Sequence, residues 1–174
     1  DGAVEEGADQ WAIVAHRVVG NSSAHLADYD EALHHQRKIL EVYRRRGDFT
    51  GVAQALQALG LTSVDMGLYD EAVEQLTESV NLIRAHGGEA DDLLFSVNGL
   101  GLAHLVLGHY DAARAAFDES LALARTLETP VWEAMALVNL GHLSIPLMEY
   151  GEARGLFVEG KKLAEQTNGR QFAF

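Results

Sequence analysis

The stretch Gly67-Leu68-Tyr69-Asp70-Glu71-Ala72 is one of four related copies along the 174-residue chain. The other copies are Ala27-Asp28-Tyr29-Asp30-Glu31-Ala32, Gly108-His109-Tyr110-Asp111-Ala112-Ala113 and Met148-Glu149-Tyr150-Gly151-Glu152-Ala153. Their tyrosines are 40, 41 and 40 residues apart. A fixed period in this range is typical of repeat arrays, in which each unit buries its apolar face against its neighbours.

A glycine lies twelve residues before each repeated alanine. A larger residue lies four residues after the alanine. The glycines are Gly20, Gly60, Gly101 and Gly141, and the larger residues are Gln36, Leu76, Phe117 and Phe157. Glycine inside a helix costs about 1 kcal/mol relative to alanine, so a recurring glycine indicates a recurring gain in packing. We predict that each glycine faces the alanine of the next helix, and that the tyrosine fills the wedge between units.

The segments between these positions read as helices. Apolar residues recur at three- and four-residue spacing in 51–66 and 70–86, and again in the later units, which predicts amphipathic helices rather than strands. Carboxylates such as Asp70 and Glu71 follow each repeated tyrosine position. The helix dipole favours negative charge at a helix N-terminus, so these residues indicate where the second helix of each pair begins. Breaks fall at Gly47-Asp48, Gly87-Gly88 and Thr129-Pro130.

These breaks predict a single domain over residues 10–168, made of four helix-turn-helix units at about 10–48, 49–90, 91–129 and 130–168. We expect residues 1–9 to be a flexible lead-in and residues 169–174 to be a tail or the start of a further helix. The chain begins with Asp1 rather than methionine, which indicates an excised or processed product. Pro146 should kink the first helix of the last unit or end it early.

Composition excludes several classes of function. With 13 Lys+Arg against 26 Asp+Glu, the formal net charge of −13 repels a phosphate backbone, so no direct nucleic-acid binding is expected. Cysteine is absent, which removes disulfides, thiol catalysis and cysteine zinc sites. No apolar run approaches the roughly 18 residues that span a bilayer. We expect a cytoplasmic protein without membrane contact.

Together, the repeated glycine, alanine and tyrosine resemble the tetratricopeptide repeat over residues 10–168. The period exceeds the usual length of roughly 34 residues. It is similar to the longer class in kinesin light chains, Pins-type adaptors and bacterial transcriptional regulators. This resemblance implies an all-α, right-handed superhelix of four helix-turn-helix repeats. It also implies a non-catalytic module that binds a protein or peptide, and the arginine-rich, lysine-poor composition favours a larger bacterial regulatory protein.

In that family the first helix of each repeat lines a concave groove. Aligning the repeats on their glycines identifies the residues of this chain that would line that groove. The assigned residues are Gln57, Leu61, Phe95, Asn98, Leu102, Leu105, Met135, Val138, Asn139 and His142. Several apolar residues on an open face indicate a bound helix or extended peptide. By the resemblance, Asn98 and Asn139 would hold the peptide backbone. No lysine stands at the groove positions, so a carboxylate clamp for chaperone tails is not expected.

Four alternatives to an open peptide groove remain. The superhelix closes on itself there, or a neighbouring segment covers the face. The module self-associates into a homo-oligomer, or it senses a small apolar ligand. Catalysis is not expected, because the chain has no phosphate-binding loop and no nucleophile elbow. The eight histidines lack the spacing of metal ligands, so neither a metal nor a cofactor is expected.

Overall fold

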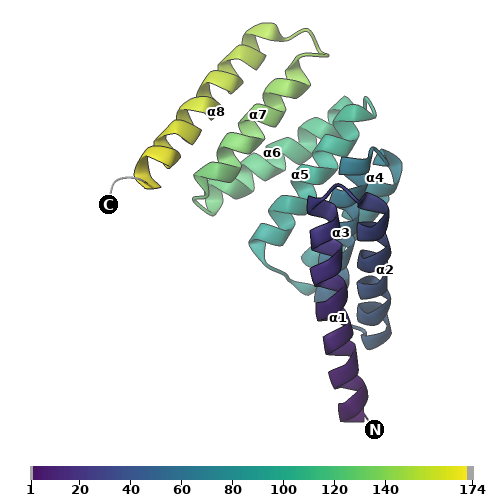
Figure 1. Ribbon diagram of the computed structural model, residues 1–174. Coiled ribbons are helices and arrows are strands. Elements are labelled where there is room, and N and C mark those ends of the chain that lie inside the picture. The colour runs from purple at the N-terminus through teal and green to yellow at the C-terminus, as the bar shows by residue number, and fades with distance from the viewer. Residues whose placement is uncertain (1, 172–174) are drawn as a thin grey trace. The chain divides into compact units, whose positions relative to one another are not determined.

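The computed structural model describes the backbone of residues 2–171 and the side chains of residues 7–167, and this part of the chain is all-α (Figure 1). Its helices are α1 (Gly2–His25), α2 (Tyr29–Arg46), α3 (Phe49–Met66), α4 (Tyr69–His86), α5 (Ala90–Val106), α6 (Tyr110–Thr126), α7 (Pro130–Ser144) and α8 (Tyr150–Gln171). The all-α class and the repeated helical hairpin predicted from the sequence are therefore confirmed.

Consecutive helices pair as the repeat requires. Helices α1 and α2, α3 and α4, and α7 and α8 pack as hairpins, while α2 packs on α3 and α6 on α7 across repeat boundaries. Helix α7 ends at Ser144, two residues before Pro146, as the proline predicts. Helix α1 begins at Gly2, so residues 2–9, expected as a lead-in, form its first turns. Helix α8 continues to Gln171, and the rest of the expected tail lies outside the described residues.

The contacts divide the chain into two compact units where a single domain was expected. Unit 1 extends to Asp92 and unit 2 starts at Leu93, so the boundary falls in the first turn of α5. The core of unit 1 gathers around Leu33, Ile39, Leu56 and Leu59. The core of unit 2 gathers around Ala113, Phe117, Leu140 and Leu143.

Local chemistry explains where the helices begin and end. The Asp48 carboxylate accepts a hydrogen bond from the Gly51 amide at 2.9 Å and so caps α3. Helices α2 and α3 end on Gly47 and Gly67, both left-handed. Proline is the first residue of α7. An N–H group at this position would have no acceptor within the helix, so its absence in proline costs no hydrogen bond.

The tight turn inside each hairpin contains one residue with a left-handed backbone. The φ angles there are 59° at Ala27, 83° at Gly67, 75° at Gly108 and 63° at Met148. Two repeats supply glycine, which adopts this conformation freely, and two do not. The turn geometry is therefore common to all four repeats, although the residue type is not.

The recurring glycines make room for the larger residue of the partner helix, not mainly for the alanine as predicted. A Cβ on Gly60 would lie 2.5 Å from Leu76 Cγ, and one on Gly141 would lie 2.7 Å from Phe157 Cε1. Gly101 lies against the ring of Phe117 in the same way. In the first repeat, where Gln36 replaces the apolar residue, Gly20 lies nearest to His35 Cβ. The alanine is among the nearest contacts only in the first repeat, where Ala32 O lies 3.6 Å from a Cβ on Gly20. In the other three repeats the longer side chain supplies the three nearest atoms.

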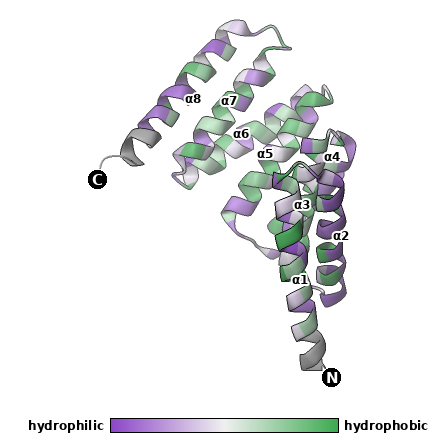
Figure 2. Ribbon diagram, viewed as in Figure 1, coloured by the Kyte–Doolittle hydropathy of each residue, from purple (hydrophilic) through white to green (hydrophobic). Residues whose placement is uncertain are grey.

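The repeated alanines are buried, whereas the tyrosines differ among repeats. Each tyrosine is the first residue of the second helix. Tyr110 packs against the core of unit 2, but Tyr150 is 64% exposed and fills no wedge. Helices α3, α5 and α7 are more hydrophobic than α2 and α8, consistent with the colouring of Figure 2.

Candidate functional site

The ten residues assigned to the groove fall into both units. Gln57 and Leu61 lie on α3 in unit 1. The other eight lie on α5 and α7 in unit 2: Phe95, Asn98, Leu102, Leu105, Met135, Val138, Asn139 and His142.

Helices α5 and α7 are joined by an aromatic contact at their exposed side. The rings of Phe95 and Trp132 meet edge to face, with centroids 4.5 Å apart. Phe95 is 43% exposed and the nearby Met135 is 40% exposed, while Trp132 is half-buried. We call the surface formed by Phe95, Trp132, Met135 and His142 the α5–α7 face. It presents large apolar side chains from two first helices.

The two asparagines of the set bind each other. Asn139 Nδ2 donates a hydrogen bond to Asn98 Oδ1 at 2.7 Å, and Asn98 Nδ2 lies 3.8 Å from Met135 Sδ. Asn98 is 7% exposed and Asn139 is 8% exposed. A buried amide needs such a partner, because an unpaired one loses its hydration without compensation. The pair fastens α5 to α7 beneath the α5–α7 face.

The remaining members of the set take different positions. Leu102 and Leu105 are half-buried and pack against the core of unit 2. The Val138 side chain is directed at Gly160 of α8, where a Cβ would lie 3.1 Å from Val138 Cγ2. His142 is exposed, and its ring centroid lies 5.1 Å from that of Phe157. Phe95, Met135 and His142 are thus the assigned residues with the most accessible side chains.

In unit 1, Gln57 serves the connection between repeats. Its Nε2 donates to the Asp92 carbonyl at 2.6 Å, and Gln54 Nε2 donates to the Asp92 carboxylate at 2.9 Å. Both glutamines therefore hold the first turn of α5. Leu61 is half-buried on the same helix.

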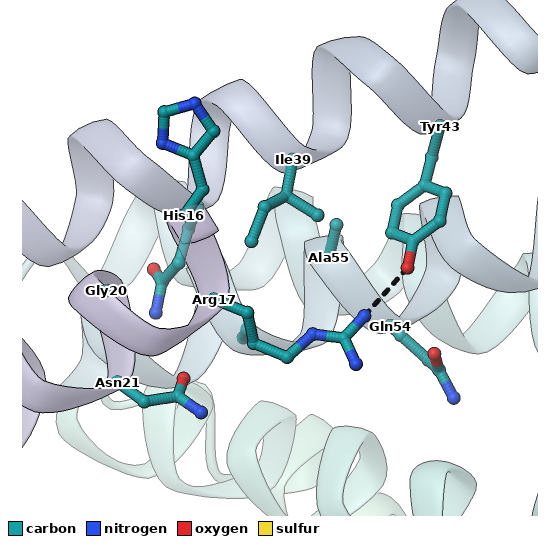
Figure 3. A pocket seen from close by; sticks show the side chains of 10 residues that line it. His16, Arg17, Gly20, Asn21, Ile39, Tyr43, Gln54 and Ala55 are labelled. Carbon is teal, nitrogen blue, oxygen red and sulfur yellow. Dashed lines mark hydrogen bonds between the residues drawn. The ribbon is translucent and has the colours of Figure 1, made fainter. Parts of the chain in front are cut away.

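Unit 1 also contains a partly open cavity of about 120 Å³ lined by residues of α1, α2 and α3, which we call the α1–α3 cavity (Figure 3). Its floor consists of the buried residues Gly20, Gln36, Ile39, Tyr43 and Ala55. Its rim consists of the more accessible residues His16, Arg17, Asn21, Gln54 and Ala58. Figure 3 shows Arg17 extended across the cavity toward Tyr43, with Gln54 beside it. Arg17 Nη2 donates to the Tyr43 hydroxyl at 2.8 Å.

None of these cavity residues was assigned to a site from the sequence, and Gln36 is the buried polar residue among them. It is 6% exposed, and its Nε2 donates to Thr62 Oγ1 at 2.9 Å, while its Oε1 is buried without a hydrogen-bond partner. The sequence did carry a signal. Gln36 is polar at the position where the other repeats have Leu76, Phe117 and Phe157.

Two histidine pairs lie on the helices of the two units. In unit 1, His16 Nδ1 lies 2.7 Å from His35 Nδ1. Burial lowers the pKa of His16, and His35 lowers it further because two neighbouring positive charges repel. In unit 2, His104 Nδ1 lies 3.3 Å from His109 Nδ1, and burial followed by the charge of His109 lowers the pKa of His104.

Metal binding and membrane insertion find no support in the described structure. Among residues 7–167, no cluster of three or more histidine, aspartate or glutamate side chains is arranged to bind a metal ion. Over the described length of the chain, every helix is too short or too polar to span a membrane.

Comparison with known proteins gives relatives of the same fold. The chain is 28% identical to outer dynein arm-docking complex subunit 4 of Danio rerio over 135 residues, which are 78% of this chain and 27% of that protein. It superposes on BtubC (BKLC) from P. vanneervenii with a TM-score of 0.79 and 16% identity, covering 90% of this chain and 65% of that one.

A Rap protein complexed with Competence and Sporulation Factor is also similar. Its TM-score is 0.80 at 17% identity, over 90% of this chain and 44% of that one. The chain thus spans about a quarter of the curated relative, and less than two thirds of these two solved structures. At these identities, the solved structures establish the fold alone.

Direct evidence for the family comes from the repeat itself. The family model described as tetratricopeptide repeat matches residues 12–85 and again residues 51–126. Those two matches cover the first three hairpins, and the fourth carries the same glycine, alanine and tyrosine. The chain therefore belongs to the tetratricopeptide repeat family, whose fold generally serves as a non-catalytic scaffold for protein interactions.

Proposed function

We propose that this chain is a non-catalytic module that binds a peptide or a protein helix through the α5–α7 face. The observation that carries the proposal is the exposure of two large apolar residues on adjacent first helices, Phe95 at 43% and Met135 at 40%. Hot spots of protein interfaces are formed by such clustered side chains, and aromatic residues dominate them. Trp132 supports Phe95 from the side, so the ring is held in position before a partner arrives.

The asparagine pair refines this proposal. Asn98 and Asn139 satisfy each other beneath the face, so a peptide backbone would have to replace their mutual hydrogen bond. Exchange of one hydrogen bond for another yields little net free energy. We therefore assign the affinity for a partner to Phe95, Met135 and Trp132, and assign the asparagines to holding α5 and α7 in register.

We further propose that the module is the sensing or assembly region of a larger bacterial regulatory protein in the cytoplasm. The chain spans 27% of the outer dynein arm-docking subunit and 44% of the Rap protein, which supports a role within a longer protein. One solved structure of the same fold, a Rap protein, is complexed with Competence and Sporulation Factor. That complex supports a partner-binding role for this fold.

Selection of peptides against the full chain tests the α5–α7 face. Peptides chosen from a random library for binding the full chain are then measured against Phe95→Ala/Met135→Ala. We expect their affinity to fall by about tenfold or more, because truncation of hot-spot residues costs over 1 kcal/mol each. The matched control is Val131→Ala/Val158→Ala, which truncates apolar residues of comparable or greater exposure elsewhere in unit 2. Equal affinity for both double variants would reject the face.

Self-association is the second candidate, and a separate observation favours it. Helix α1 exposes Trp11 at 76%, Val14 at 47% and Val18 at 62%, and their spacing places them on one side of the helix. We propose that this stripe pairs two copies of the chain. Analytical ultracentrifugation should then show a dimer that Trp11→Lys converts to a monomer. A strictly monomeric wild-type chain at high concentration removes this candidate.

A further inference from the structure

The first and last helices, α1 and α8, each carry a side that the inner helices bury. The second helix of one repeat packs on the first helix of the next, as α2 does on α3 and α6 does on α7. Among residues 2–171, no second helix precedes α1 and no first helix follows α8. In the described part of the chain, each of these two helices therefore has one side without its usual neighbour.

Two contacts identify the side of α3 that meets α2. Gly51 lies against the ring of Tyr43, and Thr62 Oγ1 accepts a hydrogen bond of 2.9 Å from Gln36 Nε2. Helical spacing places two further residues on this side. All four α3 residues are buried, and they are Gly51, Ala55, Leu59 and Thr62. This side of a first helix is thus covered where a second helix precedes it.

The equivalent side of α1 is open to solvent. Aligning the repeats on Gly20 and Gly60 gives four residues, which we call the α1 end face: Trp11, Ala15, Val19 and Ser22. All four are exposed, and Trp11 is the largest of them at 76%. An exposed tryptophan at a position that the next repeat buries indicates a surface that a partner covers.

Helix α8 carries the complementary side. On α2, the side that meets α3 contains four buried residues: Leu33, Gln36, Leu40 and Tyr43. Aligning the repeats on their alanines gives the equivalent residues of α8, which we call the α8 end face: Arg154, Phe157, Lys161 and Ala164. Phe157 is half-buried and the other three are exposed. An open groove runs along this face, with Tyr150 and Ile145 at its N-terminal end.

Side-chain size matches the two end faces to each other. Where Tyr43 meets Gly51, a large residue of the second helix lies against a small residue of the first. The α6–α7 junction has the opposite combination at the same repeat positions, with Ala124 on α6 and Trp132 on α7. The end faces carry that combination again, alanine at position 164 and tryptophan at position 11. One large residue at this point suits close packing of two helices.

Charge favours the same combination. Consecutive helices joined by short turns run antiparallel, so the same packing would place the end of α8 beside the start of α1. Residues 160–171 contain three basic residues and one acidic, whereas residues 2–11 contain three acidic and none basic. Within one copy, Lys161 is paired with Glu165 and Asp9 with Arg45, which leaves two basic and two acidic residues. Opposite charges on two docking segments favour their encounter and fix their alignment.

We propose that copies of this chain associate head to tail, with the α8 end face of one copy packed on the α1 end face of the next. The contact repeats the packing of second helix on first helix that joins repeats within one copy. It rests on the self-association proposed above, and it names the surface that meets Trp11. Because the two faces differ, a dimer keeps one free face of each kind, and larger assemblies form as the concentration rises.

Complementary variants of the full chain test this contact by sedimentation velocity. Trp11→Lys disables the α1 end face and Ala164→Lys disables the α8 end face, and both residues are exposed, so both variants should fold. Each variant alone should self-associate about tenfold more weakly than the wild type, or worse. An equimolar mixture should form a dimer that does not grow, because each copy supplies the face that the other lacks. The matched control is Ala122→Lys, at an exposed alanine of α6 outside both end faces, which should associate as the wild type does.

Three other outcomes would overturn the proposal, and each has a different meaning. If Ala164→Lys associates as the wild type does while Trp11→Lys is monomeric, two α1 helices pair with each other, and only the head-to-tail contact fails. If the mixed variants stay monomeric, the two end faces do not meet. If the wild type is monomeric at the highest concentration, self-association itself fails, and the partner of the end faces is not a second copy. Peptide binding at the α5–α7 face is measured separately and does not depend on these results.

Discussion

Asn139 donates a hydrogen bond of 2.7 Å to Asn98, 41 residues earlier, and both amides are buried between α5 and α7. The pair links the first helices of two successive repeats. Because neither side chain reaches bulk solvent, each depends on the other for its hydrogen bonding. The consequences for stability are therefore unequal for single and double substitutions.

Replacing one asparagine should lower the free energy of unfolding more than replacing both. Asn139→Leu leaves Asn98 Oδ1 buried without a donor, which we expect to cost about 1–3 kcal/mol. The double variant Asn98→Leu/Asn139→Leu removes both polar groups and should recover part of that loss. A double-mutant cycle by urea denaturation measures the difference. Strictly additive losses would show that the two amides do not act as a pair.

The glycines that face large side chains should not tolerate a methyl group. Gly141→Ala places a Cβ about 2.7 Å from the Phe157 ring, and we expect a loss of about 1–3 kcal/mol from overpacking. The control is Gly155→Ala in α8, where a Cβ meets nothing within 4 Å. That change should stabilise by about 1 kcal/mol, because alanine is the better helix former. Thermal melts of the two variants should shift in opposite directions, and shifts in the same direction would contradict this account.

Glycine should stabilise the two hairpin turns that lack it. Met148 has a φ of 63° and is 77% exposed, so Met148→Gly relieves backbone strain without loss of packing. We expect a gain of about 1 kcal/mol, since a left-handed conformation costs a non-glycine residue roughly that amount or more. Gly67→Ala, at the equivalent turn, should lose a similar amount. Chemical denaturation checks both, and a loss in Met148→Gly would refute the argument.

Stability should fall as pH drops below neutrality. Burial lowers the pKa of His16 and of His104 below 6.5, the ordinary value that these groups regain on unfolding. As pH falls through that value, the unfolded chain therefore binds more protons than the folded chain, and protonation favours unfolding. Melting temperatures at about pH 7.5 and about pH 5.5 should differ less in His16→Gln/His104→Gln than in the wild type. The control, His25→Gln at the exposed end of α1, should keep the wild-type difference.

Much of the fold could be predicted because its signals are local. The Gly67–Ala72 stretch and its three copies mark where each second helix begins, since a left-handed turn, a tyrosine and acidic residues precede or open it. The end of α7 before Pro146 and the start of α7 at Pro130 follow from the geometry of proline alone. The burial of the repeated alanines follows from the periodicity of the helix.

The candidate sites depend on contacts that no local pattern specifies. One register assigned both Phe95 and Leu102 to a groove, yet Phe95 is exposed and Leu102 packs against the core. The assignment fixed which helix carries each residue. It did not fix which neighbouring side chain covers it.

The sequence by itself therefore determined the helices, the turns and the family of this protein, because hydrogen bonding and apolar periodicity act over a few residues. The tertiary structure alone decided the long-range partners. It set Phe157 against Gly141, joined Asn98 to Asn139, and left Gln36 Oε1 without a hydrogen-bond partner. Such contacts depend on side-chain length and on how two packed helices are displaced, which the spacing of residues does not encode.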